Sequence, residues 1–160
     1  MTPDGEKKAA ALRERLGKKK FDAVFSSPLQ RARRTAELAG FPDAQLTAVL
    51  REVDYGEYEG MTTKAIREIR PDWELYKDGS PAGETPAQIY ARAMDFITLA
   101  SAVRGRVLAF SHGHFLRAVA IAWMRLGIKA ASTLDLDVAT LSLLRDEERG
   151  RVLAMWNSPS

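Results

Sequence analysis

The stretch RVLAFSHGHFLRAVAIAW, residues 106–123, indicates the fold class of this chain. It opens with a short apolar run at 106–110, which is typical of a buried strand. It continues into a segment at 115–126 that is apolar almost all round, which predicts a buried helix. Between the two lie His112 and His114, and these are the only histidines in the 160 residues. A strand that runs through a polar turn into a helix is the repeating unit of an α/β fold.

The same alternation of strands and helices recurs along the chain in both directions from this stretch. Thr2-Pro3 and Thr85-Pro86 each combine a capping hydroxyl with a proline at the first helical position, which predicts two helix starts. The pattern predicts an α/β layer fold with a mainly parallel sheet. The predicted elements are strands at 21–27 and 44–50, helices at 3–16, 28–39, 63–70 and 86–103, and a C-terminal hairpin of 140–146 and 151–157.

The composition is ordinary for a soluble protein and suits a single domain over residues 1–160. The chain has no cysteine, which excludes disulfides, thiolate metal sites and a cysteine nucleophile. The first ten residues, MTPDGEKKAA, lack the apolar segment of a signal peptide, and no apolar run approaches membrane-spanning length. We therefore expect a cytoplasmic protein with no membrane partner.

Positive charge is concentrated near the N-terminus. Residues 1–34 contain ten Lys and Arg against four Asp and Glu, although the net charge of the whole chain is only +3. Such an excess favours an anionic partner. No aromatic residue is interleaved with the GKKK run at 17–20, which weakens the interpretation as a nucleic-acid site, and these lysines can also form a solvated helix face. We expect a small phosphorylated compound or inorganic phosphate as the partner, and no nucleic acid.

Two strand-to-helix junctions carry residues suited to binding such an anion. Arg31 lies in the first turn of its predicted helix, where the helix dipole disfavours a cation unless an anion is near. A guanidinium also matches phosphate with two parallel hydrogen bonds. At the second junction His112 follows a strand, and Gly113 permits close approach of the backbone to a ligand. Ligands in parallel α/β folds bind at the carboxyl ends of the strands, so we expect both junctions to form one site.

Glu52 is the candidate acid of this site. It lies in LREVDYGEYEGMTT and directly follows the apolar AVL, which predicts that it ends a strand at the same edge of the sheet. A carboxyl group that is partly removed from water there could hold a proton for a leaving group. A metal site is the alternative for His112 and His114, but without cysteine or a third histidine it needs carboxylates alone. We expect neither a metal nor another cofactor.

Four blocks, in this order, resemble the histidine phosphatase superfamily, the phosphoglycerate mutase-like group. The similarity extends from about Thr2 to Asn157 and is strongest to the broad-specificity acid phosphatases and the sugar-bisphosphatase-like members. It implies a three-layer α/β fold with helices on both faces of the sheet, and phosphoryl transfer through a phosphohistidine without a metal. The blocks are FSSPLQRARRTAELAG, EVDYGEYEGMTTKAIREIRPDW, DGSPAGET and FSHGHFLRAVAIAW.

The resemblance assigns a role to each candidate residue. Arg31 corresponds to the arginine that clamps the phosphate, His112 to the second histidine of the site, and Glu52 to the proton donor. The backbone at Gly113 and His114 would help to cradle the same anion.

The block DGSPAGET corresponds to a loop that shapes the substrate mouth in this superfamily, and Gly83, Glu84 and Thr85 would line that mouth. The run from 54 to 85 looks more like the acid phosphatases than like glycolytic mutases, which carry a longer insertion in this region. A phosphoglycerate mutase-type phosphotransferase is therefore the less favoured alternative. The pair Asp135 and Asp137 in LDLDVAT resembles the nucleophile motif of haloacid dehalogenase-type phosphatases, but no apolar strand precedes it.

The superfamily's defining Arg-His-Gly motif, which supplies the nucleophilic histidine, is absent from the 160 residues. The resemblance begins just downstream of the strand that bears this motif, so the first central strand is expected to be missing. The strand at 106–110 would then have an unpaired edge, which favours a homodimer. We expect these residues alone to be inactive. Either Met1 is not the natural start of a phosphatase, or the chain is a phosphate-binding or interaction module without turnover.

Overall fold

The strands of the chain form two sheets. The computed structural model describes residues 2–159. Three parallel strands lie in the order β2-β1-β3, and an antiparallel hairpin pairs β4 with β5. Among the described residues β3 pairs only with β1, so its other edge has no strand partner. The strands are β1 (Ala23–Ser26), β2 (Gln45–Leu46), β3 (Val107–Phe110), β4 (Leu141–Glu147) and β5 (Gly150–Ser158).

Helices connect the strands, and the two Thr-Pro starts are confirmed. Thr2 accepts a hydrogen bond from the N–H of Gly5, and Thr85 forms a reciprocal capping box with Gln88. No helix within residues 2–159 is long and apolar enough to span a bilayer. The helices are α1 (Pro3–Leu16), α2 (Gln30–Leu38), α3 (Thr63–Ile69), α4 (Leu75–Asp78), α5 (Pro86–Ser101) and α6 (Gly113–Trp123), with 3₁₀ turns η1 (Ala48–Leu50), η2 (Gly56–Tyr58) and η3 (Ile128–Thr133).

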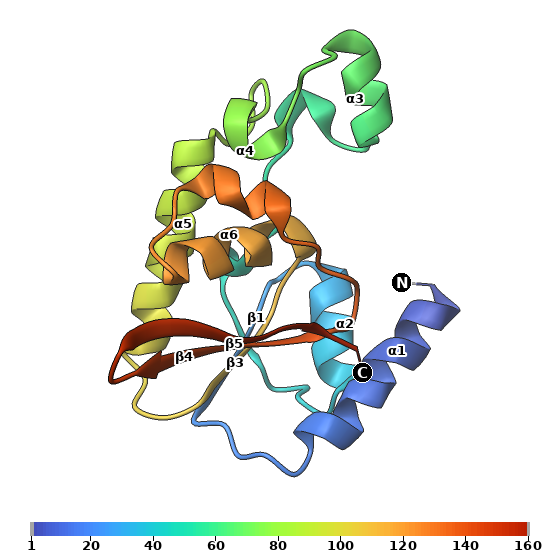
Figure 1. Cartoon of the computed structure of the whole chain (residues 1–160). Coiled ribbons are helices and arrows are strands. Elements are labelled where there is room, and N and C mark those ends of the chain that lie inside the picture. Colours follow the sequence, from blue (N-terminus) through green and yellow to red (C-terminus); the bar gives the residue numbers. More distant parts are fainter. Residues whose placement is uncertain (1, 160) are drawn as a thin grey trace.

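The parallel sheet is covered on both faces, which gives three layers. Successive side chains of a strand point to opposite faces. Phe25 and Ala109 therefore pack into a core cluster built largely from α5 and α6, whereas Val24 and Phe110 pack against α1 and α2. Figure 1 shows α1 and α2 on one side of β1 and β3, with α5 and α6 on the other. The predicted α/β fold with helices on both faces is confirmed.

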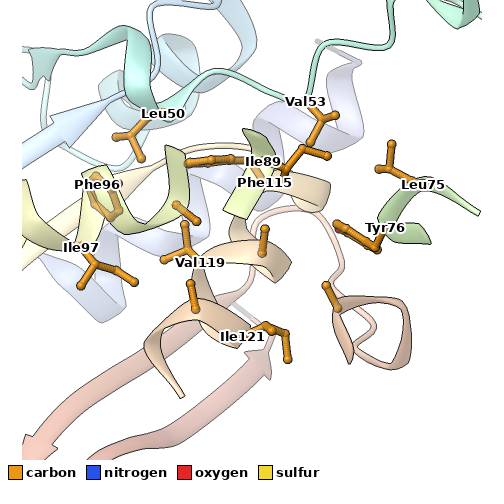
Figure 2. Close-up of a cluster of buried hydrophobic side chains, with 14 of the residues drawn as sticks. Leu50, Val53, Leu75, Tyr76, Ile89, Phe96, Ile97, Phe115, Val119 and Ile121 are labelled. Carbon is orange, nitrogen blue, oxygen red and sulfur yellow. The ribbon is translucent and has the colours of Figure 1, made fainter. Parts of the chain in front are cut away.

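The larger core cluster holds the start of α6 in place. Ile89 from α5 and Phe115 and Val119 from α6 lie together in its centre (Figure 2), and Ile89 and Phe115 are fully buried. Burying a side chain of this size stabilises the fold by roughly 1.5–3 kcal/mol. The turn at 111–114 between β3 and α6 is therefore anchored on both sides.

Helices α2 and α6 begin at other residues than predicted, and the conformation of the preceding residues explains both starts. Helix α2 begins at Gln30 rather than at 28, because Ser27 Oγ accepts the N–H of Leu29 and keeps that residue extended. Helix α6 begins at Gly113 rather than at 115, because the extended His112 forms its N-cap. The short helix α4 was not predicted.

The strand predicted at 44–50 ends after Leu46. The N–H of Thr47 still bonds to the carbonyl of Ser26, and the chain then turns into η1, which directs Leu50 into the core. Glu52 therefore follows a 3₁₀ turn and not a strand, so the strand-end position expected for it was wrong. Its carboxyl group reaches the sheet edge from a loop.

Candidate active site

His112 lies at the carboxyl end of β3, where it forms the N-cap of α6 and is 5% exposed. Its Nδ1 accepts a hydrogen bond from Arg31 Nε at 2.8 Å. Its Nε2 lies 2.8 Å from Ser27 Oγ at the end of β1. Because a guanidinium only donates, Nδ1 is the acceptor and the ring proton of the neutral imidazole is on Nε2, which donates to Ser27. The site therefore fixes the tautomer of His112.

The imidazole of His112 is also held in its neutral form. Burial, together with the positive charges of Arg31 and Arg92, lowers the pKa of His112 to about 4. At neutral pH the lone pair of Nδ1 is shared with Arg31. A phosphoryl oxygen could contact Nδ1 of His112 only by replacing Arg31 Nε. Nδ1 would then have to carry a proton in order to donate to that oxygen.

Arg31 connects this buried histidine to an open cavity. It lies in the first turn of α2, as expected, and its side chain lines a cavity of about 680 Å³. Within residues 2–159 only its Nε has a hydrogen-bond partner, so both terminal nitrogens are free to donate. The register of β1 and β3 places Ser26 opposite Phe110, which brings the two junctions together at one edge of the sheet. The structure thus brings Arg31 and His112 together.

Glu52 approaches the same place from the loop after η1. Its Oε1 accepts hydrogen bonds from the N–H of Val53 at 3.1 Å and of Phe115 at 3.0 Å. The second bond uses an N–H of the first turn of α6, which has no acceptor within the helix. The carboxylate is 17% exposed and lines the cavity. A loop residue is therefore held against the helix that His112 caps.

His114 contributes its side chain as well as its backbone. Its Nδ1 lies 2.7 Å from the hydroxyl of Tyr55 and 4.0 Å from Glu52 Oε2. Burial lowers the pKa of His114 and raises the pKa of the Tyr55 hydroxyl, so at neutral pH the tyrosine donates and the imidazole accepts. Tyr76 donates to the carbonyl of His114 at 2.7 Å. Sequence reasoning missed both tyrosines, which carried no signal beyond the acidic, aromatic character of their segment.

The residues of the DGSPAGET block lie in different environments. Glu84 lines the cavity, but its carboxylate is bound by Arg92 and by the N–H of Asp54. Gly83 packs against the same loop, and a Cβ there would collide with the carbonyl oxygen of Asp54. Thr85 caps α5 and is not part of the cavity lining. Sequence reasoning also missed Arg92, which lies inside a regular helix.

No group of three or more histidine, aspartate or glutamate side chains in the described part of the chain is arranged to hold a metal ion. Four carboxylates line the cavity, and each accepts a hydrogen bond from a backbone N–H of this region. These acids therefore order the loop around the cavity. They are Glu52, Asp54, Glu59 and Glu84.

The fold and this site define an α/β protein that places an arginine and a histidine together at the ends of neighbouring parallel strands. Residues 1–159 match the sequence profile of the histidine phosphatase superfamily (branch 1), and the chain belongs to this superfamily.

Known relatives agree with this assignment. An acid phosphatase of Mycobacterium tuberculosis is 39% identical over 159 residues, covering 97% of this chain and 78% of that protein. The sedoheptulose 1,7-bisphosphatase of Saccharomyces cerevisiae is 35% identical over 70% of this chain and 51% of its own length. The solved structure of the M. tuberculosis open reading frame Rv3214 matches with a TM-score of 0.95 at 37% identity, over 99% of this chain and 84% of that one.

Proposed function

We propose that this chain forms the phosphate-binding and proton-donating part of a phosphatase that hydrolyses small phosphomonoesters through a phosphohistidine. One observation carries the proposal: Arg31 and His112 are in direct contact, and the Glu52 carboxylate binds the helix that His112 caps. The similarity to an acid phosphatase over 97% of the chain supports the same reaction class. In this proposal Arg31 and His112 hold the phosphoryl oxygens, and Glu52 protonates the leaving oxygen.

Phosphate binding would replace the hydrogen bond between Arg31 and His112 with two hydrogen bonds to phosphoryl oxygens. A phosphoryl oxygen takes the place of the Arg31–His112 hydrogen bond, so the arginine donates to one oxygen and a protonated Nδ1 donates to another. The anion compensates for the nearby positive charges that help to keep His112 neutral. The backbone N–H groups of Gly113 and His114 lie at the start of α6, where they and the positive end of the helix dipole would stabilise the bound anion.

Glu52 is suited to protonate the leaving group. Its Oε1 is fixed by two backbone N–H groups, while its Oε2 is the oxygen nearest His114 at the cavity. In the substrate complex the Glu52 carboxyl group carries a proton, and this proton transfers to the leaving oxygen as the P–O bond breaks and negative charge develops there. Water then regenerates the carboxylic acid when it attacks the phosphohistidine, because the glutamate accepts the proton of that water.

The nucleophile must be an imidazole with a free nitrogen in line with the leaving group. Both nitrogens of His112 have protein partners. In His114, Nδ1 accepts from Tyr55, so the ring proton lies on Nε2 and that nitrogen has no lone pair for attack. We propose that an Arg-His-Gly segment outside residues 1–160 supplies the attacking histidine. The 160 residues alone would then bind phosphate without turnover.

The test is the intact mass and the activity of the protein purified from its natural source. A mass several kilodaltons above 17.7 kDa, Arg-His-Gly in the added peptide and an acid-labile phosphohistidine during hydrolysis would support the proposal. A mass of 17.7 kDa with phosphate binding and no hydrolysis would instead support a binding module. Hydrolysis by the 17.7 kDa chain that is lost in His114→Ala would contradict the assignment of the nucleophile.

A further inference from the structure

Arg92 on α5 uses all of its N–H groups in the region of Glu52. Its Nε and Nη2 donate to the two carboxylate oxygens of Glu84 at 2.7 and 2.6 Å. Its Nη1 donates to the carbonyls of Val49 at 3.0 Å and Arg51 at 2.8 Å, and its Nη2 donates to the carbonyl of Glu52 at 3.4 Å. The side chain is 18% exposed. A guanidinium has five N–H donors, and here each has an acceptor.

Glu84, the partner of Arg92, holds the other side of the same loop. Its Oε2 accepts the N–H of Asp54 at 2.9 Å, and its own N–H donates to the carbonyl of Asp54 at 2.9 Å. The ion pair of Arg92 and Glu84 therefore binds the backbone at 49, 51, 52 and 54. Glu52 lies within the segment that this pair holds at both ends.

No strand or long helix supports the loop at this point, and the only other side chain in the described residues that binds one of its carbonyls is Ser111, which donates to Leu50 at 2.7 Å. After Thr47 the chain makes no sheet hydrogen bond until β3, and η1 and η2 are single 3₁₀ turns on either side of Glu52. Carbonyl groups that are partly buried in such a segment need side-chain partners. The guanidinium carbon of Arg92 also lies 4.0 Å from the ring centre of Phe115, whose N–H binds the Glu52 carboxylate. Arg92 thus contacts both the backbone of Glu52 and the residue that receives its carboxylate.

We propose that Arg92 is a positioning residue for Glu52: paired with Glu84, it fixes the loop so that the Glu52 carboxyl group lies beside His114 and the start of α6. That this carboxyl group acts as the proton donor rests on the proposed function. Its placement does not. Lysine cannot replace Arg92, because an ammonium lacks the planar fork that bridges a carboxylate and several carbonyls.

The placement can be measured in the 160-residue chain by NMR titration of His114, which is simple because the chain has only two histidines. The charged and titratable groups around His114 are Glu52, Tyr55, Tyr76 and Arg117. Burial lowers the pKa of His114, and the nearby carboxylate of Glu52 opposes this shift. Removing that charge with Glu52→Gln should lower the pKa of His114 by about one unit in the otherwise unchanged chain.

The same substitution is then made in variants of Arg92. In Arg92→Met and Arg92→Lys we expect Glu52→Gln to lower the pKa of His114 by less than about a third of that amount, because the carboxylate is no longer held there. Arg67→Met is the matched control, since Arg67 also bonds a backbone carbonyl, that of Trp73, but does not contact the Glu52 loop. The full effect of Glu52→Gln should persist in Arg67→Met.

An undiminished effect of Glu52→Gln in either Arg92 variant would overturn the proposal. Unfolding of both Arg92 variants would also overturn it, because Arg92 would then support the fold as a whole. Hydrolysis by the protein from its natural source separates the two proposals. There, Arg92→Lys should slow alkyl phosphate hydrolysis roughly a hundredfold and leave nitrophenyl phosphate nearly unchanged, as expected for a misplaced general acid. Absence of hydrolysis by the unsubstituted protein would refute the proposed function, while the titration still decides the placement of Glu52.

Discussion

Lowering the pH should destabilise this chain through His112. The pKa of His112 is lowered from 6.5 to about 4 in the folded state, chiefly by burial, and returns to its ordinary value on unfolding. Between these two values the unfolded chain holds more protons than the folded chain. The free energy of unfolding therefore falls as the pH is lowered through this window, and the contribution of His112 is complete only above pH 6.5.

The size of the effect follows from the two pKa values. The full difference corresponds to about 3 kcal/mol, and the part lost between pH 7 and pH 5 is about 2 kcal/mol. This is a large fraction of the stability of a domain of this length. His114 acts in the same direction, because its pKa is lowered as well.

The variant His112→Asn isolates the contribution of His112. An asparagine oxygen can still accept from Arg31 Nε but does not titrate, so this variant should lose about 2 kcal/mol less between pH 7 and pH 5. Urea unfolding followed by tryptophan fluorescence measures both chains, since Trp73 is almost fully buried. His114→Asn serves as a control and should retain the His112-dependent loss. Parallel pH dependences of the unsubstituted chain and His112→Asn would refute the reasoning.

Four further predictions concern the anion site and the loop around it. Arg31→Ala should weaken sulfate binding about ten- to a hundredfold by calorimetry, whereas Arg33→Ala on the exposed face of α2 should not. Sulfate should bind more tightly as the pH falls from 8 to 6, by at most tenfold per pH unit, because binding protonates His112 while the charge of sulfate stays constant. His112→Asn should remove this pH dependence of the affinity. In the active phosphatase, Glu52→Gln should slow alkyl phosphate hydrolysis roughly a hundred- to ten-thousandfold and affect nitrophenyl phosphate much less; equal losses would exclude a proton donor. Gly83→Ala should lower the free energy of unfolding by about 1–3 kcal/mol, because its Cβ would meet the carbonyl of Asp54, while Gly113→Ala, with no atom within 4 Å, should not.

The parts of the fold that could be predicted are those with a local cause. The apolar run at 107–110, the Thr-Pro starts of α1 and α5 and the C-terminal hairpin are determined by side chains next to one another in the sequence. The position of Arg31 in the first turn of α2 has the same origin. Two such junctions on neighbouring parallel strands must meet at one sheet edge, so the contact between Arg31 and His112 could be anticipated.

What could not be predicted depends on contacts between distant segments. The apolar AVL at 48–50 is compatible with a strand, and only its packing into the core turns it into η1. Arg92 looks like an ordinary helix residue, because its partners lie 8 to 43 residues away in the sequence. Tyr55 likewise acquires its partner, His114, only through the tertiary fold.

The two halves of the site have different physical supports, and both meet at the start of α6. His112 is placed by the end of a paired strand and by the buried Phe115 beyond it, so its position is as rigid as the core. Glu52 is placed by a loop whose carbonyls are bound by Arg92 and Ser111 and whose carboxylate accepts the N–H of Phe115. A perturbation of the core should therefore disturb both groups. Arg92→Lys keeps the positive charge that acts on His112, so it should chiefly disturb the placement of Glu52. In Arg92→Lys the effect of Glu52→Gln on the pKa of His114 should therefore change while the affinity for sulfate does not. In Phe115→Ala both should change, and this substitution should lower the free energy of unfolding by about 3–5 kcal/mol.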